Sequence, residues 1–432
     1  MVDQPNKEPT PCTELAQDAV PLDQRRGTIT MGLLWITMVT GFPTVLAGFD
    51  WYKQGFTLKQ VFACVVASVL ILLAYTIPAC YLGAKTGLSY THLSKRTFGP
   101  RGAWLVGFNI TWSSLCWYAL SAVFLAQGLQ ALYHFNISTA WLAGGLALLM
   151  ASNNFFGFKG VANFAMFAAG PVMIAWVVYS FGLATTSMPA AVWSEPASHS
   201  MLQALGVVSA FVIGYAVWGN EADYWQFGKP SVARTTVPLV ASLVLGQVVF
   251  GVAGWLVAYL THTSNPDQAT AVMNAFTFGS ATIIAAVVLT LSYVAGNDSL
   301  LFATDQAVEN VFPGSRRIRV GILSVIASGI AVLLAQHANS FQLVASLSAI
   351  ILPAATTIMI VEAFFPRKGG SPCFGPQHQT GWPAVLALLI GSACGIATGG
   401  IVPGMAAVGV PSLQAWLGSL VAYVVLRRVW RR

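Results

Sequence analysis

The chain has 432 residues, of which 56% are hydrophobic and only 8% are charged, with a formal net charge of +7. Soluble domains normally carry about 25% charged residues, so the composition excludes a water-soluble globular protein and predicts one embedded in lipid. The positive charge does not indicate a nucleic-acid partner. The basic residues are scattered at the ends of apolar segments, where they retain inner loops against anionic lipid.

Residues 1–27 are polar and are expected to form a disordered cytoplasmic tail. Residues 28–432 are expected to form a single transporter domain of twelve transmembrane helices. The spans must be helices because unpaired backbone groups cannot face hydrocarbon, and no span shows the alternation of a barrel. The expected spans are residues 29–48, 61–82, 103–133, 139–157, 161–184, 202–223, 236–260, 279–303, 319–336, 341–364, 382–401 and 408–429.

The basic residues also predict the orientation of these spans. Of the 21 Lys and Arg residues, 19 fall on one side of the trace, and only Lys53 and Lys59 fall on the other. Cytoplasmic loops carry an excess of Lys and Arg. We therefore expect a multi-pass cell-membrane protein with both termini in the cytoplasm.

Two of the expected spans look interrupted. The first carries Thr40-Gly41-Phe42-Pro43 near its centre, and the sixth carries Gly214 and then Trp218-Gly219-Asn220. Proline removes a backbone donor, and glycine adds conformational freedom. Spans one and six lead two five-helix halves of opposite orientation, and breaks at matching positions predict a transporter with its site at the midplane, at Gly41. The alternative is that Gly and Pro are common in membrane helices.

Aromatic and amide side chains within the spans predict a site for a flat ligand. Trp117 lies midway along the third span, and Ser121 follows one turn later on the same face. A planar ring could stack on the indole of Trp117 and on that of Trp218. Asn297 in the eighth span offers both a donor and an acceptor to the edge of such a ring. Ordinary helix packing is the alternative for Trp117.

Three carboxylates are candidates for coupling transport to a cation. Asp298 could titrate or could hold a neighbouring helix through a hydrogen bond. Glu221 and Asp223 lie near the inner end of span six. They could couple transport to protons, form an inner gate, or be solvated charges at a helix end. The sequence has no phosphate-binding glycine loop, nucleophile elbow or metal signature. We therefore expect neither an ATPase nor an enzyme, and no cofactor or bound metal.

Three motifs resemble those of the cytosine/purine permeases, within the nucleobase–cation symporter family. Gly83-Ala84-Lys85-Thr86-Gly87-Leu88 with Phe98-Gly99 is similar to the inner loop of that family. Glu221-Ala222-Asp223-Tyr224 with Phe227-Gly228 is similar to the end of its helix six, and Asn297-Asp298 to its helix-eight pair. The resemblance covers roughly residues 26–430.

The resemblance implies a five-plus-five inverted-repeat fold with broken helices one and six and two added C-terminal helices. It implies uptake of a nucleobase or a related heterocycle, driven by a cation gradient. The stacking aromatic on helix three then matches Trp117, and its polar partner matches Ser121. The helix-six aromatic falls at Trp218, with Tyr215 as an alternative, and the helix-eight position matches Asn297.

One departure from the family bears on the coupling ion. Sodium-coupled members carry hydroxyl residues just before the helix-eight pair, whereas this chain has Ala295 and Gly296. We therefore expect proton rather than sodium coupling, with Asp298, Glu221 and Asp223 as candidate carriers. The prediction is a secondary active permease for cytosine or a purine. The alternatives are a permease for another planar amide (allantoin, hydantoin, uracil or a thiamine-precursor pyrimidine) and a non-transporting receptor or scaffold, against which the matched breaks argue.

Overall fold

The computed structural model describes residues 19–216, 219–263, 268–309, 311–337, 340–365, 380–405 and 408–430. These residues form helices, and within them the one β-type pairing is an isolated bridge between Arg26 and Gly228. The longer helices are α2 (Thr28–Val39), α3 (Phe42–Lys53), α4 (Leu58–Thr86), α5 (Tyr90–Tyr133), α6 (Thr139–Met150), α7 (Gly157–Phe164), α8 (Gly170–Thr186), α9 (Met201–Ala216), α11 (Val232–Leu243), α12 (Gly251–Leu260), α14 (Thr282–Glu309), α15 (Arg316–Leu334), α16 (Ser340–Phe364), α17 (Trp382–Thr398) and α18 (Pro411–Val429). Shorter pieces are η1 (Leu22–Gln24), η2 (Ser152–Phe156), η3 (Ala165–Ala169), η4 (Ala190–Ser194), α10 (Ala222–Trp225), η5 (Val244–Phe250) and α13 (Ala269–Ala275).

The helices confirm an all-α membrane architecture. In the described part of the chain, seven helices are long and apolar enough to cross a membrane, and α2 with α3 makes an eighth, bent by 41° at its break. Two shorter apolar helices, Met201–Tyr215 and Trp382–Thr398, fall where spans six and eleven were expected. The count of twelve spans stays a prediction, because length and composition alone identify fewer.

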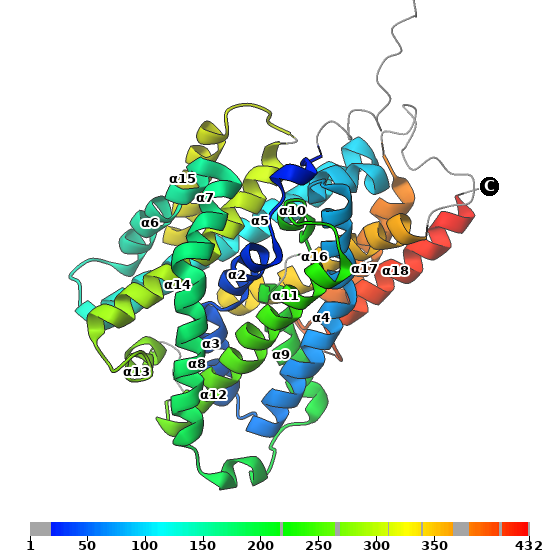
Figure 1. Cartoon of the computed structure of the whole chain (residues 1–432). Helices are drawn as coiled ribbons and strands as arrows, with labels where there is room; N and C mark the ends of the chain where they lie inside the picture. The colour runs from blue at the N-terminus through cyan, green and yellow to red at the C-terminus, as the bar shows by residue number, and fades with distance from the viewer. Residues whose placement is uncertain are drawn as a thin grey trace, which may run out of the picture.

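The two halves of the first broken helix lie at the centre of the bundle, and α17 and α18 lie at one edge beside α16 (Figure 1). α3 packs closely against α12, and Gly48 makes this approach possible. A Cβ at Gly48 would overlap the backbone of Gly251, Gly254 and Trp255. Small residues at such crossings let membrane helices pack backbone to backbone.

The inner side is the expected cytoplasmic side, and it carries the blue start of the ribbon at the top of Figure 1. Residues 19–27, the last part of the expected disordered tail, are packed there against the helix ends. The amide of Arg26 donates to the carbonyl of Phe227 at 2.6 Å. Arg25 is only 8% exposed and donates to the carbonyl of Ala84. The earlier part of the tail lies outside the described residues.

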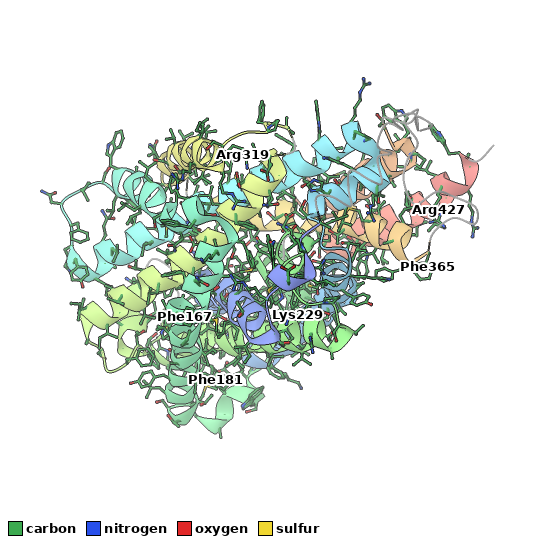
Figure 2. All side chains as sticks on the ribbon, turned by 45° about the horizontal axis from the view of Figure 1, so that its top comes forward. Phe167, Phe181, Lys229, Arg319, Phe365 and Arg427 are labelled. Atoms are coloured by element: carbon green, nitrogen blue, oxygen red, sulfur yellow. The ribbon has the colours of Figure 1, made fainter. Side chains whose placement is uncertain are left out.

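Charged side chains gather on the inner side, and apolar ones cover the flanks. Figure 2, which turns the inner side toward the viewer, shows Lys229, Arg319 and Arg427 there and Phe167 on the flank, where it is 75% exposed. Arg319 pairs with Asp305 at 2.7 Å, which neutralises that charge between α14 and α15. An apolar flank with a charged rim is what a lipid-embedded bundle requires.

Candidate functional site

The break in helix one, between α2 and α3, is closed by polar side chains from two other helices. The carbonyl of Val39 lies at the end of α2, and it accepts hydrogen bonds from Gln247 Nε2 at 3.2 Å and from Thr44 Oγ1 at 3.3 Å. The amide of Phe42, at the start of α3, donates to Ser292 Oγ at 3.1 Å. The break therefore leaves backbone groups at depth, and side chains bond them in place of a helical partner.

Gln247 reaches the break because the span formed by α11, η5 and α12 is locally unwound. It lies in η5, a π-helical stretch between α11 and α12. Beside it, a Cβ at Gly246 would come within 2.7 Å of the Val39 carbonyl carbon, so only glycine allows this approach. π-helical insertions are frequent at functional sites.

The second break separates α9 from α10 in helix six. Gly219 has φ +81°, a conformation that side chains rarely adopt. Its carbonyl accepts a hydrogen bond from Thr356 Oγ1 of α16 at 2.5 Å. Trp218, the predicted second stacking face, lies outside the described residues, so its role stays a prediction.

Four aromatic side chains, Trp117, Phe211, Tyr215 and Phe341, form an aromatic cluster next to the breaks. The Trp117 indole is fully buried, with its ring centroid 5.1 Å from that of Tyr215 and 5.9 Å from that of Phe341. Phe211 stacks on Tyr215 at 5.1 Å and 18°. The indole Nε1 donates to Ser348 Oγ of α16 at 3.2 Å. Residues of α5, α9 and α16 thus fix the plane of the indole.

The structure brings two of the predicted residues into direct contact. The hydroxyl of Tyr215 lies against Gly41, where a Cβ would overlap it. Tyr215 therefore reaches the first break from helix six and contacts Trp117 with the same ring. Ser121 is 5% exposed and follows Trp117 by one turn of α5.

Asn297 contacts the backbone of α5 directly after Trp117, and the protein already uses its donor. Its Nδ2 lies 3.1 Å from the carbonyl of Tyr118 and 3.1 Å from Met150 Sδ. Its Oδ1 is buried without a hydrogen-bond partner among the described residues. The same holds for Tyr293 Oη and Thr40 Oγ1. Because buried polar atoms are normally bonded, these atoms mark where a ligand or water can bond.

Asp298 has a structural partner that the sequence analysis missed. Its two oxygens accept from Asn153 Nδ2 at 2.7 Å and from Asn154 Nδ2 at 3.3 Å. The asparagines lie in η2, directly after α6. Two adjacent amide side chains in an otherwise apolar span were the available signal.

The two carboxylates of helix six differ in their partners. Asp223 accepts from the amide of Tyr90 at 2.8 Å and from Asn220 Nδ2 at 3.1 Å, so it links helix six to the start of α5. Glu221 is completely buried, and neither of its oxygens has a hydrogen-bond partner of good geometry in the described part of the chain. The amides of Gly219 and of Glu221 itself lie near its carboxyl, and Asp223 lies close enough to interact with it electrostatically. Glu221 is therefore an uncompensated group, whereas Asp223 is satisfied.

Comparison with known proteins places this architecture among transporters. A family model for permeases for cytosine/purines, uracil, thiamine and allantoin matches residues 20–398. The cytosine permeases of Escherichia coli K12 and of Escherichia coli O157:H7 are each 25% identical over 425 residues, which is 96% of this chain and 95% of theirs.

Solved structures share the fold at low sequence identity. Mhp1, a nucleobase-cation-symport-1 family transporter solved in a closed conformation with bromovinylhydantoin bound, matches with a TM-score of 0.73 at 17% identity, over 96% of this chain and 94% of that one. A Na+-coupled sialic acid symporter matches with a TM-score of 0.65 at 13% identity, over 94% and 90% of the two chains.

The predicted family, transporter fold and multi-pass membrane nature are thereby confirmed. The relatives are permeases and symporters rather than enzymes, which supports a cation-coupled transporter. The family model covers most of the chain, and this protein belongs to the family of permeases for cytosine/purines, uracil, thiamine and allantoin.

Proposed function

We propose that this chain imports a nucleobase, cytosine or a purine, together with a proton. The observation that carries the proposal is the meeting of both helix breaks at the aromatic cluster, beside buried polar atoms without partners. Stacking faces with a few edge contacts bind a small planar ring. The curated relatives named cytosine permease support the substrate class.

The substrate would stack on Trp117 and reach the helix breaks with its polar edge. Asn297 Oδ1 has no donor among the described residues, so it favours a ring that presents an N–H or amino donor, as cytosine and adenine do. Ser121, Tyr215 and Gly41 complete the proposed site, and Trp218 remains its proposed second face. Uracil, allantoin and hydantoin also present N–H donors, so a competition panel must separate them.

Proton coupling is favoured because the groups for a sodium ion are missing or occupied. The Val39 carbonyl already accepts an N–H from Gln247, which a cation would have to displace. Ala295 and Gly296 supply no side-chain oxygen on the neighbouring helix. A sodium ion requires several oxygen ligands, and the Ser292 hydroxyl at this break already bonds the amide of Phe42, which leaves Thr40 Oγ1 as an unpartnered side-chain oxygen there among the described residues.

Among the three carboxylates, Glu221 is the best candidate for the proton carrier. Asp298 and Asp223 each accept two hydrogen bonds as they stand, which suits ionised, structural carboxylates. An ionised carboxylate buried without a partner costs several kcal/mol, and a proton on Glu221 removes most of that cost. In this proposal Asp223 stabilises the inner gate, and Asp298 fixes η2 to α14.

Flux measurements on the purified protein in proteoliposomes test the proposal. Uptake of labelled cytosine should rise with an inward proton gradient and should not respond to added sodium at constant pH and membrane potential. Unlabelled adenine, uracil, allantoin and hydantoin should be added as competitors. Sodium-driven uptake would contradict proton coupling, and competition by hydantoin or allantoin but not by cytosine or adenine would contradict the substrate class.

The proposal also places both termini in the cytoplasm of a cell membrane. It rests on the Lys and Arg distribution and on Arg427 and Arg428 in the last turn of α18. Protease cleavage of an added C-terminal tag should occur in inside-out vesicles and not in intact cells. Cleavage in intact cells would show that the C-terminus lies outside the cell and would contradict the proposed orientation.

A further inference from the structure

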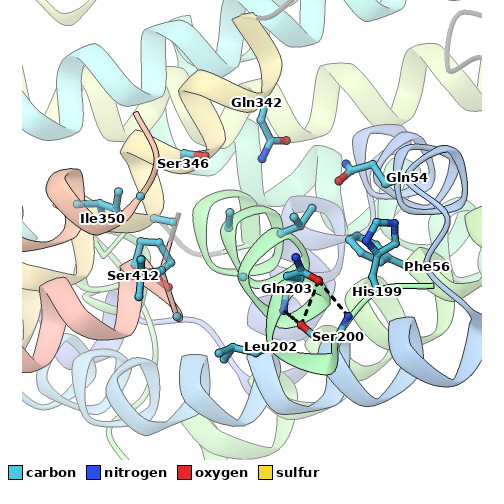
Figure 3. Close-up of a pocket in the computed structure, with 18 residues that line it drawn as sticks. Gln54, Phe56, His199, Ser200, Leu202, Gln203, Gln342, Ser346, Ile350 and Ser412 are labelled. Carbon is cyan, nitrogen blue, oxygen red and sulfur yellow. Dashed lines mark hydrogen bonds between the residues drawn. The ribbon is translucent and has the colours of Figure 1, made fainter. Parts of the chain in front are cut away.

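A cavity of about 670 Å³ lies on the outer side, between α9, α16 and the C-terminal helices (Figure 3). Figure 3 shows Gln54, Phe56 and His199 on one side of it and Ile350 and Ser412 on the opposite side. Small-molecule sites typically measure about 300–1,000 Å³. This cavity is therefore large enough for a ligand of that kind.

The cavity and the aromatic cluster are lined by different residues of the same two helices. On α9, Ala210 lines the cavity, whereas Tyr215 contacts Trp117. On α16, Ile350 lines the cavity, whereas Ser348 accepts the hydrogen bond of the indole. An occupant of the cavity would therefore contact the helices that fix the transport site without entering that site.

α9 and α16 touch without a gap between these two faces. A Cβ at Gly214 would overlap the carbonyl of Ala345 and would lie 3.3 Å from the Ala349 methyl. Ala349 itself lines the cavity. Because close-packed interfaces transmit displacement, a molecule in the cavity would restrain the outer half of helix six through this contact.

The lining defines the chemistry of the occupant. The described lining residues include no Lys, Arg, Asp or Glu, and His199 at one side is their one ionisable group, which favours a neutral molecule over a lipid phosphate. Exposed polar side chains, including Gln203 and Gln342, stand at the rim, and the interior is mostly aliphatic. Ser412 lines the interior, is 4% exposed, and its hydroxyl has no partner among the described residues. This hydroxyl is closed off in the empty cavity, and a change of the Ser412 rotamer would turn it toward one hydrogen-bonding group of an occupant.

We propose that this cavity is a regulatory site for a neutral small molecule with an apolar body and one hydrogen-bonding group. The hydrogen-bonding group bonds to Ser412, and the apolar body fills the aliphatic interior. The occupant then holds α9 against α16. Occupancy then slows transport. Only the flux readout of this proposal rests on the proposed function.

The test places a neutral group in the cavity by covalent tethering. In the Ser346→Cys variant, benzyl methanethiosulfonate applied from outside forms a benzyl disulfide and releases methanesulfinate. The matched control is Leu343→Cys, one turn away on α16 and 48% exposed, and treated wild-type protein controls for the native cysteines. Modification of Ser346→Cys should slow cytosine uptake about tenfold, within the usual range of allosteric coupling. Modification of Leu343→Cys should leave uptake unchanged.

Intact mass measurements read out access and chemical preference independently of transport. Relative to Leu343→Cys, Ser346→Cys should react faster with the benzyl reagent than with the charged trimethylammonium-ethyl reagent. Equal preference at both positions would overturn the neutral, apolar character of the site. Complete modification of Ser346→Cys with unchanged uptake would overturn its regulatory role.

A separate variant tests the anchor. Ser412→Ala removes a hydroxyl that has no hydrogen-bond partner among the described residues, so the melting temperature should stay the same or rise. A fall of several degrees would show that the hydroxyl is already satisfied and would remove it from the site. If wild-type protein moves no nucleobase, the proposed function fails, whereas the reactivity and melting experiments still decide whether the cavity binds as proposed.

Discussion

The two broken helices place their polar groups in opposite situations. At the first break, the carbonyl of Val39 and the amide of Phe42 are both bonded, by Gln247 and Ser292 of other helices. At the second break, the carboxyl of Glu221 is fully buried and has no good donor among the described residues. The first break has bonded backbone groups and keeps neutral polar atoms such as Thr40 Oγ1 without a partner among the described residues, whereas the second keeps an ionisable group without one.

This difference indicates a division of labour between the breaks. A satisfied break is stiff, because displacing it costs hydrogen bonds that would then be left unmade at depth. A buried carboxyl without partners changes its local free energy by several kcal/mol on gaining or losing a proton. We therefore expect the first break to shape the substrate site and the second to respond to the proton.

The Glu221→Gln variant should show the largest effect. Glutamine keeps the size of the side chain but cannot release a proton, so proton-driven accumulation of cytosine should fall to equilibrium. Exchange of labelled for unlabelled cytosine across the membrane should persist, because it needs no net proton movement. Accumulation measured beside exchange in the same proteoliposomes checks this, and wild-type accumulation would move the carrier elsewhere.

Trp117→Ala and Asn297→Ala should each abolish measurable uptake while the protein still inserts. Loss of the indole removes base stacking worth about 1–3 kcal/mol, or roughly 5- to 150-fold in affinity. Asn297→Ala also removes the side-chain donor to the Tyr118 carbonyl, which costs about 0.5–1.5 kcal/mol of stability in addition. Trp117→Phe, which keeps a stacking face, is the control. Wild-type transport by either alanine variant would remove the proposed site.

Alanine at the two glycines of the breaks should separate a folding defect from a binding defect. Gly219 has φ +81°, so Gly219→Ala strains the backbone by about 1–2 kcal/mol and also meets the carbonyl of Leu352 at 2.8 Å. Gly41 has φ −91°, so Gly41→Ala carries no such strain, and its methyl displaces the Tyr215 hydroxyl. Gly219→Ala should lower the melting temperature, and Gly41→Ala should mainly weaken cytosine binding. Equal melting temperatures would contradict the comparison.

The sequence predicted the parts of the site that local chemistry determines. Gly41, Pro43 and Gly219 indicate the breaks, and Trp117 is an unusual aromatic residue at the centre of an apolar span. The cross-helix partners could not be predicted in this way. Ser348 bonds Trp117 across 231 residues, and a single serine in an apolar helix does not reveal which neighbour it faces.

Gln247 and the asparagine pair of η2 illustrate the same limit for the coupling groups. The sequence offered three carboxylates as equal candidates, because burial and hydrogen-bond partners decide between them. Asn153 and Asn154 donate hydrogen bonds to the two oxygens of Asp298, and only the packing of η2 against α14 brings them together. Trp218 lies outside the described residues, and its predicted stacking role stays open to mutation.

The smallest effect is expected at Ser348, behind the aromatic cluster. Ser348→Ala removes the acceptor of the indole N–H, and a typical hydrogen bond contributes about 0.5–1.5 kcal/mol, or roughly 2- to 10-fold in affinity. Because the indole remains in place and no carboxyl is touched, the KM for cytosine should rise, whereas the maximal rate and the proton dependence should not change. Ser348→Thr, which restores the hydroxyl, should recover the wild-type KM.

A merely structural role for Ser348 would lower the maximal rate and the melting temperature and leave the KM unchanged. Ser113 provides the check on this interpretation, because its hydroxyl lies 2.7 Å from Ser348 Oγ but makes no contact with the indole nitrogen of its own. Ser113→Ala should therefore change the KM less than Ser348→Ala does. A larger effect at Ser113 would mean that helix ten does not orient the indole, and the link from helix ten to the substrate site would be lost.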